Sequence, residues 1–103
     1  MPRNSTKSAS GEPQLKQLQK ACMRLKLVSN PNRLLLVLVL ADGERSVGSI
    51  CEEIKLIYQI VSHRLGLLRH GRIVNSRRQG KRVFYSLTEI GQELARVAKV
   101  MTG

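Results

Sequence analysis

A chain of 103 residues has room for one domain, and its 18 Lys and Arg against 7 Asp and Glu leave a formal net charge of +11. Such an excess favours a phosphate-rich or acidic partner, either a nucleic acid or an anionic membrane surface. With two Tyr, one Phe and no Trp, the composition excludes an aromatic platform on which single strands or splayed RNA bases stack.

The N-terminal segment, residues 1–13, is polar and contains two of the three prolines, which predicts a flexible tail before a domain over residues 14–103. It lacks the apolar stretch of a secretory signal. The longest apolar run, residues 34–41, is too short to span a bilayer. Two cysteines are too few for a disulfide scaffold. We therefore expect a cytoplasmic protein without a membrane partner.

The first two predicted helices lie on either side of a clear start signal. Leu15, Leu18, Cys22 and Leu25 recur at three- and four-residue steps, which indicates an amphipathic helix that ends before residue 29. An Asn-Pro pair at residues 30–31 then resembles a helix cap followed by a first-turn proline. The apolar run after it also fits a buried strand, but this start and the Asp-Gly stop at residues 42–43 favour a helix.

Two further helices are predicted before residue 71. Ser46 is positioned to cap a third helix, whose buried face carries Val47, Ile50, Cys51 and Ile54. The fourth helix is expected from about residue 58 to residue 70, with a buried stripe of Val61, Leu65 and Leu68 and with Gly71 as its stop.

The periodicity changes after residue 71. Residues 73–77 and 82–87 favour strands, and the Arg-Gln-Gly-Lys segment between them predicts a hairpin. Thr88 is positioned to cap a last helix with an apolar stripe of Ile90, Leu94, Val97 and Met101. The order α-α-α-α-β-β-α predicts a mainly α fold with a β-hairpin wing, a winged helix-turn-helix.

The basic residues are concentrated where the fourth helix meets the hairpin. Residues 64–82 contain seven Lys and Arg and no acid. Such a run is either a solvated basic face or a surface for a duplex. Its position favours the duplex, because a helix fits the major groove and a hairpin beside it reaches the flanking phosphates.

Four segments have a recognisable combination of motifs: residues 29–34, 42–48, 61–69 and 78–87. In order and spacing, over residues 27–87, they resemble the ArsR/SmtB (arsenic-repressor) family of bacterial regulators. The resemblance implies a homodimer paired through its first and last helices. It also implies binding to a partly palindromic double-stranded DNA operator, and usually repression of the protein's own operon until an effector releases it.

Positions in the predicted recognition helix, about 58–70, and in the wing, residues 77–82, supply the candidate DNA contacts. In the helix they are Tyr58, Gln59, Ser62, His63 and Arg64, and in the wing they are Arg77, Arg78, Gln79, Lys81 and Arg82. Tyr58 either faces the bases or packs against the turn, and His63 is either a contact or a surface residue. The family's Gly-Leu-Ser-Gln turn is here Lys-Leu-Ile-Tyr, so Ile57 cannot cap the helix.

A sensor site is harder to place. The family's third-helix metal ligands correspond here to Ser46 and Gly48, and residues 88–101 contain no His, Asp or Cys. We therefore predict no metal site and no cofactor. Cys22 and Cys51 form either a redox switch or, the favoured interpretation, two small buried hydrophobic residues.

No Gly-rich phosphate loop, carboxylate pair or activated nucleophile is recognisable, so we expect no enzyme. Charge alone does not distinguish a transcriptional regulator from an RNA- or ribosome-associated basic module. A non-specific architectural DNA-binding protein without an effector is the third alternative, and it would lack preference for one duplex.

Overall fold

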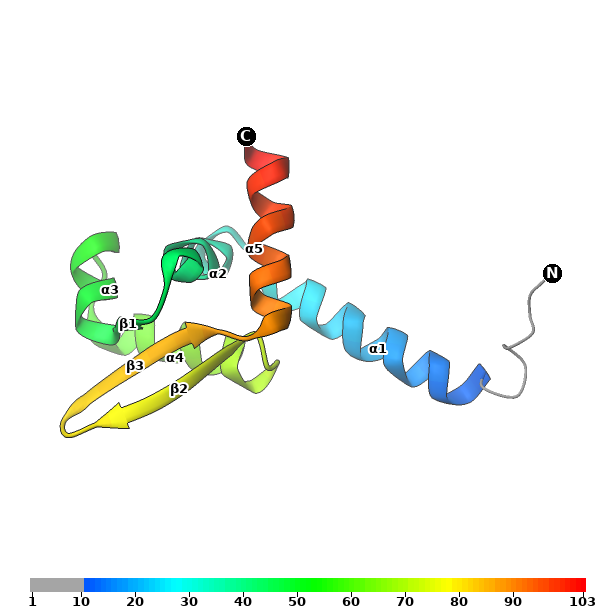
Figure 1. The fold of residues 1–103 in the computed structure, drawn as a ribbon, viewed down its shortest axis with the longest axis horizontal. Coiled ribbons are helices and arrows are strands. Elements are labelled where there is room, and N and C mark those ends of the chain that lie inside the picture. The colour runs from blue at the N-terminus through cyan, green and yellow to red at the C-terminus, as the bar shows by residue number, and fades with distance from the viewer. Residues whose placement is uncertain (1–10) are drawn as a thin grey trace.

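The structure is a computed structural model that describes residues 11–103 (Figure 1). Its elements are α1 (Gly11–Val28), α2 (Pro31–Val39), the short 3-10 helix η2 (Leu40–Asp42), β1 (Arg45–Ser46), α3 (Val47–Ile54), α4 (Tyr58–His70), β2 (Val74–Gln79), β3 (Arg82–Leu87) and α5 (Glu89–Thr102). The predicted fold class, mainly helical with a β-hairpin wing, is confirmed. Residues 1–10 of the predicted tail lie outside the described residues. Helix α1 begins at Gly11, within the last three residues of that predicted tail. The division at residue 13 therefore stays a prediction.

The predicted helix starts are confirmed by side-chain caps. The Asn30 side-chain oxygen accepts hydrogen bonds from the backbone N–H groups of Asn32 and Arg33, at 3.0 and 3.1 Å. The Ser46 hydroxyl accepts from Ser49 at 3.1 Å, and the Thr88 hydroxyl accepts from Gly91 at the same distance. Each bond satisfies a donor that the first turn of a helix leaves free.

The core lies between α2, α3, α4 and the inner face of the sheet. Its fully buried side chains include Leu36, Leu40, Ile50, Leu65, Leu68 and Ile73. The sheet is antiparallel with strand order β1-β3-β2. Strand β1 is not among the predicted elements: it has two residues, and it pairs Arg45 with Tyr85 and Ser46 with Phe84. Two residues are too few to display the alternation by which a strand is recognised.

Helices α1 and α5 each pack against this core with only part of their surface. Arg24 of α1 donates a hydrogen bond from Nε to the Gly71 carbonyl at 3.0 Å, and Leu27 packs against Gly71. Helix α5 buries Gly91, Ala95 and Ala98. A Cβ atom on Gly91 would lie 2.2 Å from the Ile73 carbonyl oxygen, so only glycine permits α5 to approach the start of β2 this closely.

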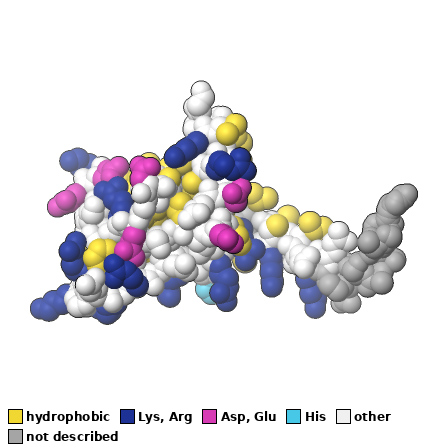
Figure 2. Space-filling model, in the orientation of Figure 1, with side chains coloured by type: hydrophobic (Ala, Val, Ile, Leu, Met, Phe, Trp, Pro, Cys, Tyr) yellow, Lys and Arg dark blue, Asp and Glu magenta, His cyan; other side chains and the backbone are white. Residues whose placement is uncertain are grey.

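Large apolar side chains of both helices remain uncovered within the single chain. They are Leu15, Leu18, Met23 and Leu25 on α1, and Ile90, Val97, Val100 and Met101 on α5. Figure 2 shows hydrophobic side chains along the upper side of α1 and near the free end of α5. The apolar stripes predicted from the sequence therefore exceed what one chain buries. No helix within residues 11–103 has the length and apolar content to cross a membrane.

Candidate nucleic-acid interface

Helix α4 has an anchored side and an outward side. Val61, Leu65 and Leu68 are buried in the core. Gln59, His63 and His70 are exposed, and their spacing places them together on the opposite side of the helix. Helix α4 is therefore held by apolar packing on one side and leaves polar side chains free on the other, as insertion into a major groove requires.

The five candidate DNA contacts of this helix differ in how exposed they are. Gln59 and His63 are exposed, whereas Ser62 and Arg64 are half-buried. Tyr58 is 51% exposed, so about half of its surface is accessible to a partner, and its role as a base contact stays a prediction. It lines a hollow of about 340 Å³ between the start of α3 and the wing, together with Lys81 and Arg82. The first turn of α4 and the wing thus share one surface.

The wing presents two faces with different roles. In the register of β2 and β3, Arg77 lies opposite Phe84 and Arg78 lies opposite Val83. Arg77 donates to both carboxylate oxygens of Glu44, at 2.7 and 2.8 Å, and its guanidinium carbon lies 4.5 Å from the centre of the Phe84 ring. Arg78 and Lys81 are exposed and form no ion pair within residues 11–103. Arg77 is thus engaged in an ion pair at the protein surface, whereas Arg78 and Lys81 are available to phosphates.

The ion pair changes the titration of both partners. Hydrogen bonding to Arg77 holds the pKa of the Glu44 carboxyl below its ordinary value. The reciprocal bond from Glu44 raises the pKa of Arg77. Gln79 accepts a further hydrogen bond from Arg77 at 3.0 Å, and Arg82 lies over the same Phe84 ring at 5.0 Å. These contacts lie between the middle of the hairpin and its turn.

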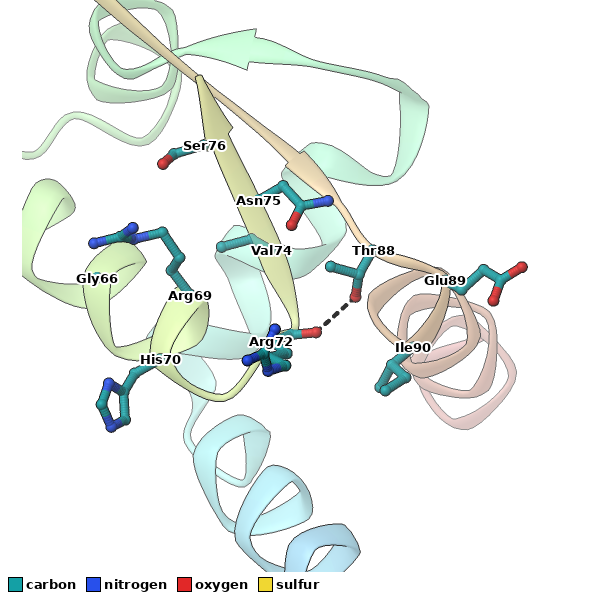
Figure 3. Close-up of a pocket in the computed structure, with 10 residues that line it drawn as sticks. All are labelled: Gly66, Arg69, His70, Arg72, Val74, Asn75, Ser76, Thr88, Glu89 and Ile90. Carbon is teal, nitrogen blue, oxygen red and sulfur yellow. Dashed lines mark hydrogen bonds between the residues drawn. The ribbon is translucent and has the colours of Figure 1, made fainter. Parts of the chain in front are cut away.

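A second basic hollow, of about 850 Å³, lies between the end of α4, β2 and the start of α5 (Figure 3). Arg69, His70 and Arg72 contribute its basic side chains, and Glu89 is the single acid among its lining residues. The Thr88 hydroxyl donates to the Arg72 carbonyl at 2.8 Å and so joins the turn after α4 to the start of α5. Sequence reasoning missed Arg69 and Arg72 as members of this surface, although both lie in the basic run.

Charge is distributed unevenly over the molecule. In Figure 2, Lys and Arg gather along the lower edge, beneath α1 and the α4–wing region, whereas most of the visible Asp and Glu lie higher. Lys16 and Lys20 of α1 are exposed and were not predicted as part of the interface. The basic surface is therefore broader than one helix and one hairpin.

The two cysteines are not brought together. Cys22 is exposed on α1, and Cys51 is half-buried against the core. Helices α1 and α3 lie at opposite ends of the long dimension of the molecule (Figure 1). The expectation that both thiols are buried is wrong for Cys22 within one chain, and the redox switch stays a prediction. Among the described residues, no three His, Cys, Asp or Glu side chains form a group that could hold a metal ion.

Comparison with known proteins gives consistent matches. The protein-family model described as "Bacterial regulatory protein, arsR family" matches residues 30–76 of this chain. The Biofilm growth-associated repressor of Xylella fastidiosa (strain Temecula1) is 38% identical over 86 residues, which are 84% of this chain and 75% of that protein. The Transcriptional activator HlyU of Vibrio cholerae is 36% identical over 73 residues, 71% of this chain and 68% of that protein.

Solved structures agree with this similarity. HlyU from Vibrio cholerae superposes with a TM-score of 0.77 at 31% identity, over 85% of this chain and 98% of that chain. A Mycobacterium bovis domain, Mb0332, described as a homodimeric winged helix-turn-helix DNA-binding domain, superposes with a TM-score of 0.76 at 27% identity, over 99% of this chain and 91% of that chain. The winged helix-turn-helix fold predicted from the sequence is confirmed.

Proposed function

Because this chain belongs to the arsR family of bacterial regulatory proteins, we propose that it acts in the cytoplasm as a dimeric repressor of its own operon. In this proposal it binds a partly palindromic duplex operator. Helix α4 enters the major groove, and the β2–β3 hairpin lies along the adjacent phosphates. The observation that carries the proposal is the outward side of α4 beside a wing with free Arg78 and Lys81, in a segment without any acid from residue 64 to residue 82.

The uncovered apolar faces of α1 and α5 support the homodimer. Exposed side chains such as Leu15, Leu18 and Val97 are stabilised by burial, and a second copy brings the same faces. The related Mycobacterium bovis domain is described as homodimeric. Light scattering at micromolar concentration should therefore give about twice the chain mass of 11.6 kDa. A mass of one chain would contradict the dimer.

Operator binding is tested by selection from a random duplex library, followed by fluorescence anisotropy on the selected duplex and a scrambled one. We expect a two-fold symmetric selected sequence and an affinity at least about 10³-fold above that for scrambled DNA. Equal affinity for all duplexes would instead indicate an architectural DNA-binding protein. Tighter binding to structured RNA of the same length would indicate an RNA-associated module.

The direction of regulation requires a separate measurement, because the relatives include both named repressors and a named activator. A reporter fused to the promoter of the protein's own gene should be more active when the gene is deleted. Expression of a Gln59→Ala variant should restore repression only partly. A reporter that falls on deletion would identify an activator.

A further inference from the structure

The N-cap residue and the first turn of α4 expose three large apolar side chains, which we name the apolar cluster. Ile57, Tyr58 and Ile60 are 61%, 51% and 37% exposed, respectively. Gln59 is the one polar residue among these four consecutive positions, and it is exposed as well. In the proposed function this turn is the part of the protein that reaches deepest into the major groove.

Neither folding nor capping explains the cluster. The buried residues of α4 are Val61, Leu65 and Leu68, so none of the three apolar residues contributes to the core. Ile57 occupies the N-cap position, where its side chain makes no hydrogen bond, although Ser, Thr, Asn or Asp would satisfy a free backbone donor there. The helix thus forgoes a cap and leaves large apolar side chains in water.

We propose that Ile57, Tyr58 and Ile60 bind the C5-methyl groups of thymine bases in the major groove, an inference that rests on the proposed operator binding. Thymine is the one unmodified base with a methyl group on this edge. Gln59, between them, has the donor and acceptor that pair with adenine N7 and N6. The turn is therefore built to recognise A·T pairs, with Gln59 on the adenine and the apolar side chains on the thymine methyl groups.

The surroundings of the cluster favour DNA over a protein partner. Lys55 precedes it and is exposed, and Arg64 follows one turn later. The hollow that Tyr58 lines contains two cations, Lys81 and Arg82, and one acid, Glu52, so the charged groups around the cluster are mainly basic. A protein surface docked here would have to accept this basic rim. The extended apolar faces of the molecule lie elsewhere, on α1 and α5. A duplex provides phosphates for the rim and methyl groups for the cluster at the same time.

Replacing thymine by uracil isolates the methyl group, because deoxyuridine differs from thymidine only at C5. The duplex selected from a thymine-containing random library is resynthesised with dU at single thymine positions and at all of them. Burial of one methyl group predicts an affinity loss of about fourfold for each contacted thymine. A symmetric operator with one such contact in each half should lose about 16-fold.

Protein variants separate direct contact from changes in the DNA itself. Ile57→Ser and Ile60→Ala should each lower the ratio of affinities for the dT and dU duplexes, because each removes one of the three proposed methyl contacts. Gln59→Ala is the matched control on the same turn: it should weaken binding to both duplexes and leave that ratio unchanged. Ile57→Ser places a capping residue at the N-cap, so we expect helix α4 to be at least as stable in this variant as in the native chain.

The outcomes distinguish the inference from the proposed function. A selected duplex whose dT and dU forms bind equally well would overturn methyl recognition and leave operator binding intact. A dT preference that is undiminished in both Ile57→Ser and Ile60→Ala would also overturn it. Failure to select any preferred duplex would overturn both proposals. A reduced dT preference in the two isoleucine variants, together with an unchanged preference in Gln59→Ala, would establish the contact.

Discussion

Arg77 and Glu44 are 33 residues apart in the chain, yet the guanidinium of Arg77 donates to both carboxylate oxygens of Glu44. Glu44 precedes β1, and Arg77 lies in the middle of β2, so the pair links the two outer strands of the sheet across β3. The ring of Phe84 on β3 lies beneath the guanidinium. The wing is therefore joined to the helix-turn-helix by a polar contact as well as by strand pairing.

We predict that this contact weakens in acid. The folded state holds the pKa of Glu44 below its ordinary value, so the pair is intact at neutral pH and is lost as the pH falls through that lowered pKa. An NMR titration of the Glu44 carboxyl carbon should show a midpoint below that of an unpaired glutamate, and Arg77→Gln should move the midpoint upward. Equal midpoints in the two proteins would contradict the prediction. Because both groups are exposed, we expect a change in wing position rather than in global stability.

Ile57→Ser should stabilise the protein. A serine hydroxyl at this N-cap can accept a hydrogen bond from the first turn of α4, which has no side-chain cap in the native chain. The expected gain is about 1 kcal/mol in the free energy of unfolding, measured by urea denaturation at fixed protein concentration. Thr88→Ala is the opposite control, since it removes an existing cap on α5 and should lose about as much. No gain for Ile57→Ser would mean that the extended backbone at residue 57 does not accommodate a cap.

Two glycine substitutions should have opposite effects. In Gly91→Ala the new Cβ would lie 2.2 Å from the Ile73 carbonyl oxygen, so α5 must move. We expect a loss of about 1–3 kcal/mol in the free energy of unfolding. In Gly48→Ala on α3 no atom lies within 4 Å of the new Cβ, and a gain of up to about 1 kcal/mol is expected from helix propensity. Equal effects of the two substitutions in thermal denaturation would show that the approach of α5 is not limited by Gly91.

An acidic residue on the apolar face of α1 should separate the dimer. Leu18→Glu introduces a charge that association would have to remove from water without a partner. Light scattering should then give a mass near 11.6 kDa instead of about twice that value. Gln17→Glu adds the same charge at an adjacent exposed position on another side of the helix, and it should leave the dimer intact. A dimeric Leu18→Glu variant would place the interface elsewhere.

Substitutions in α4 and in the wing should affect DNA binding differently. Gln59→Ala and Ser62→Ala should each cost about 1–3 kcal/mol on the preferred duplex and lower its advantage over scrambled DNA. Arg78→Ala or Lys81→Ala should weaken binding to every duplex and reduce the salt dependence by about one phosphate contact each. The measurement is anisotropy at several salt concentrations. Loss of specificity from the wing variants alone would reverse the assignment of the two elements.

The helices were predictable because their signals are local. The start of α2 is marked by Asn30 and Pro31, and α4 spans the predicted residues 58–70 because a buried stripe and Gly71 define its length. The wing hairpin was equally visible from its β-rich segments. Each of these signals lies within a few residues of the structure it predicts, so it does not depend on the rest of the fold.

Contacts between distant segments were not predictable. Strand β1 exists because Arg45 and Ser46 pair with residues about 40 positions later, and no local pattern reveals that pairing. The bond between Arg77 and Glu44 has the same origin, so Arg77 was grouped with the free wing cations. On α5 the large apolar residues dominate the pattern, yet the fully buried positions are Gly91, Ala95 and Ala98, and Leu94 of the predicted stripe packs beside them against the core. Sequence periodicity identifies an apolar face but does not say which neighbour covers it.

The two sides of α4 share no residue, and this separation has an evolutionary consequence. Val61, Leu65 and Leu68 hold the helix in the core, whereas Gln59 and His63 project away from it. Substitutions at exposed positions usually change the free energy of unfolding by less than about 0.5 kcal/mol. After a gene duplication, one copy can therefore acquire a new DNA preference through single substitutions while every intermediate still folds. Regulators with separate target genes can diverge from one scaffold in this way without compensating changes in the core.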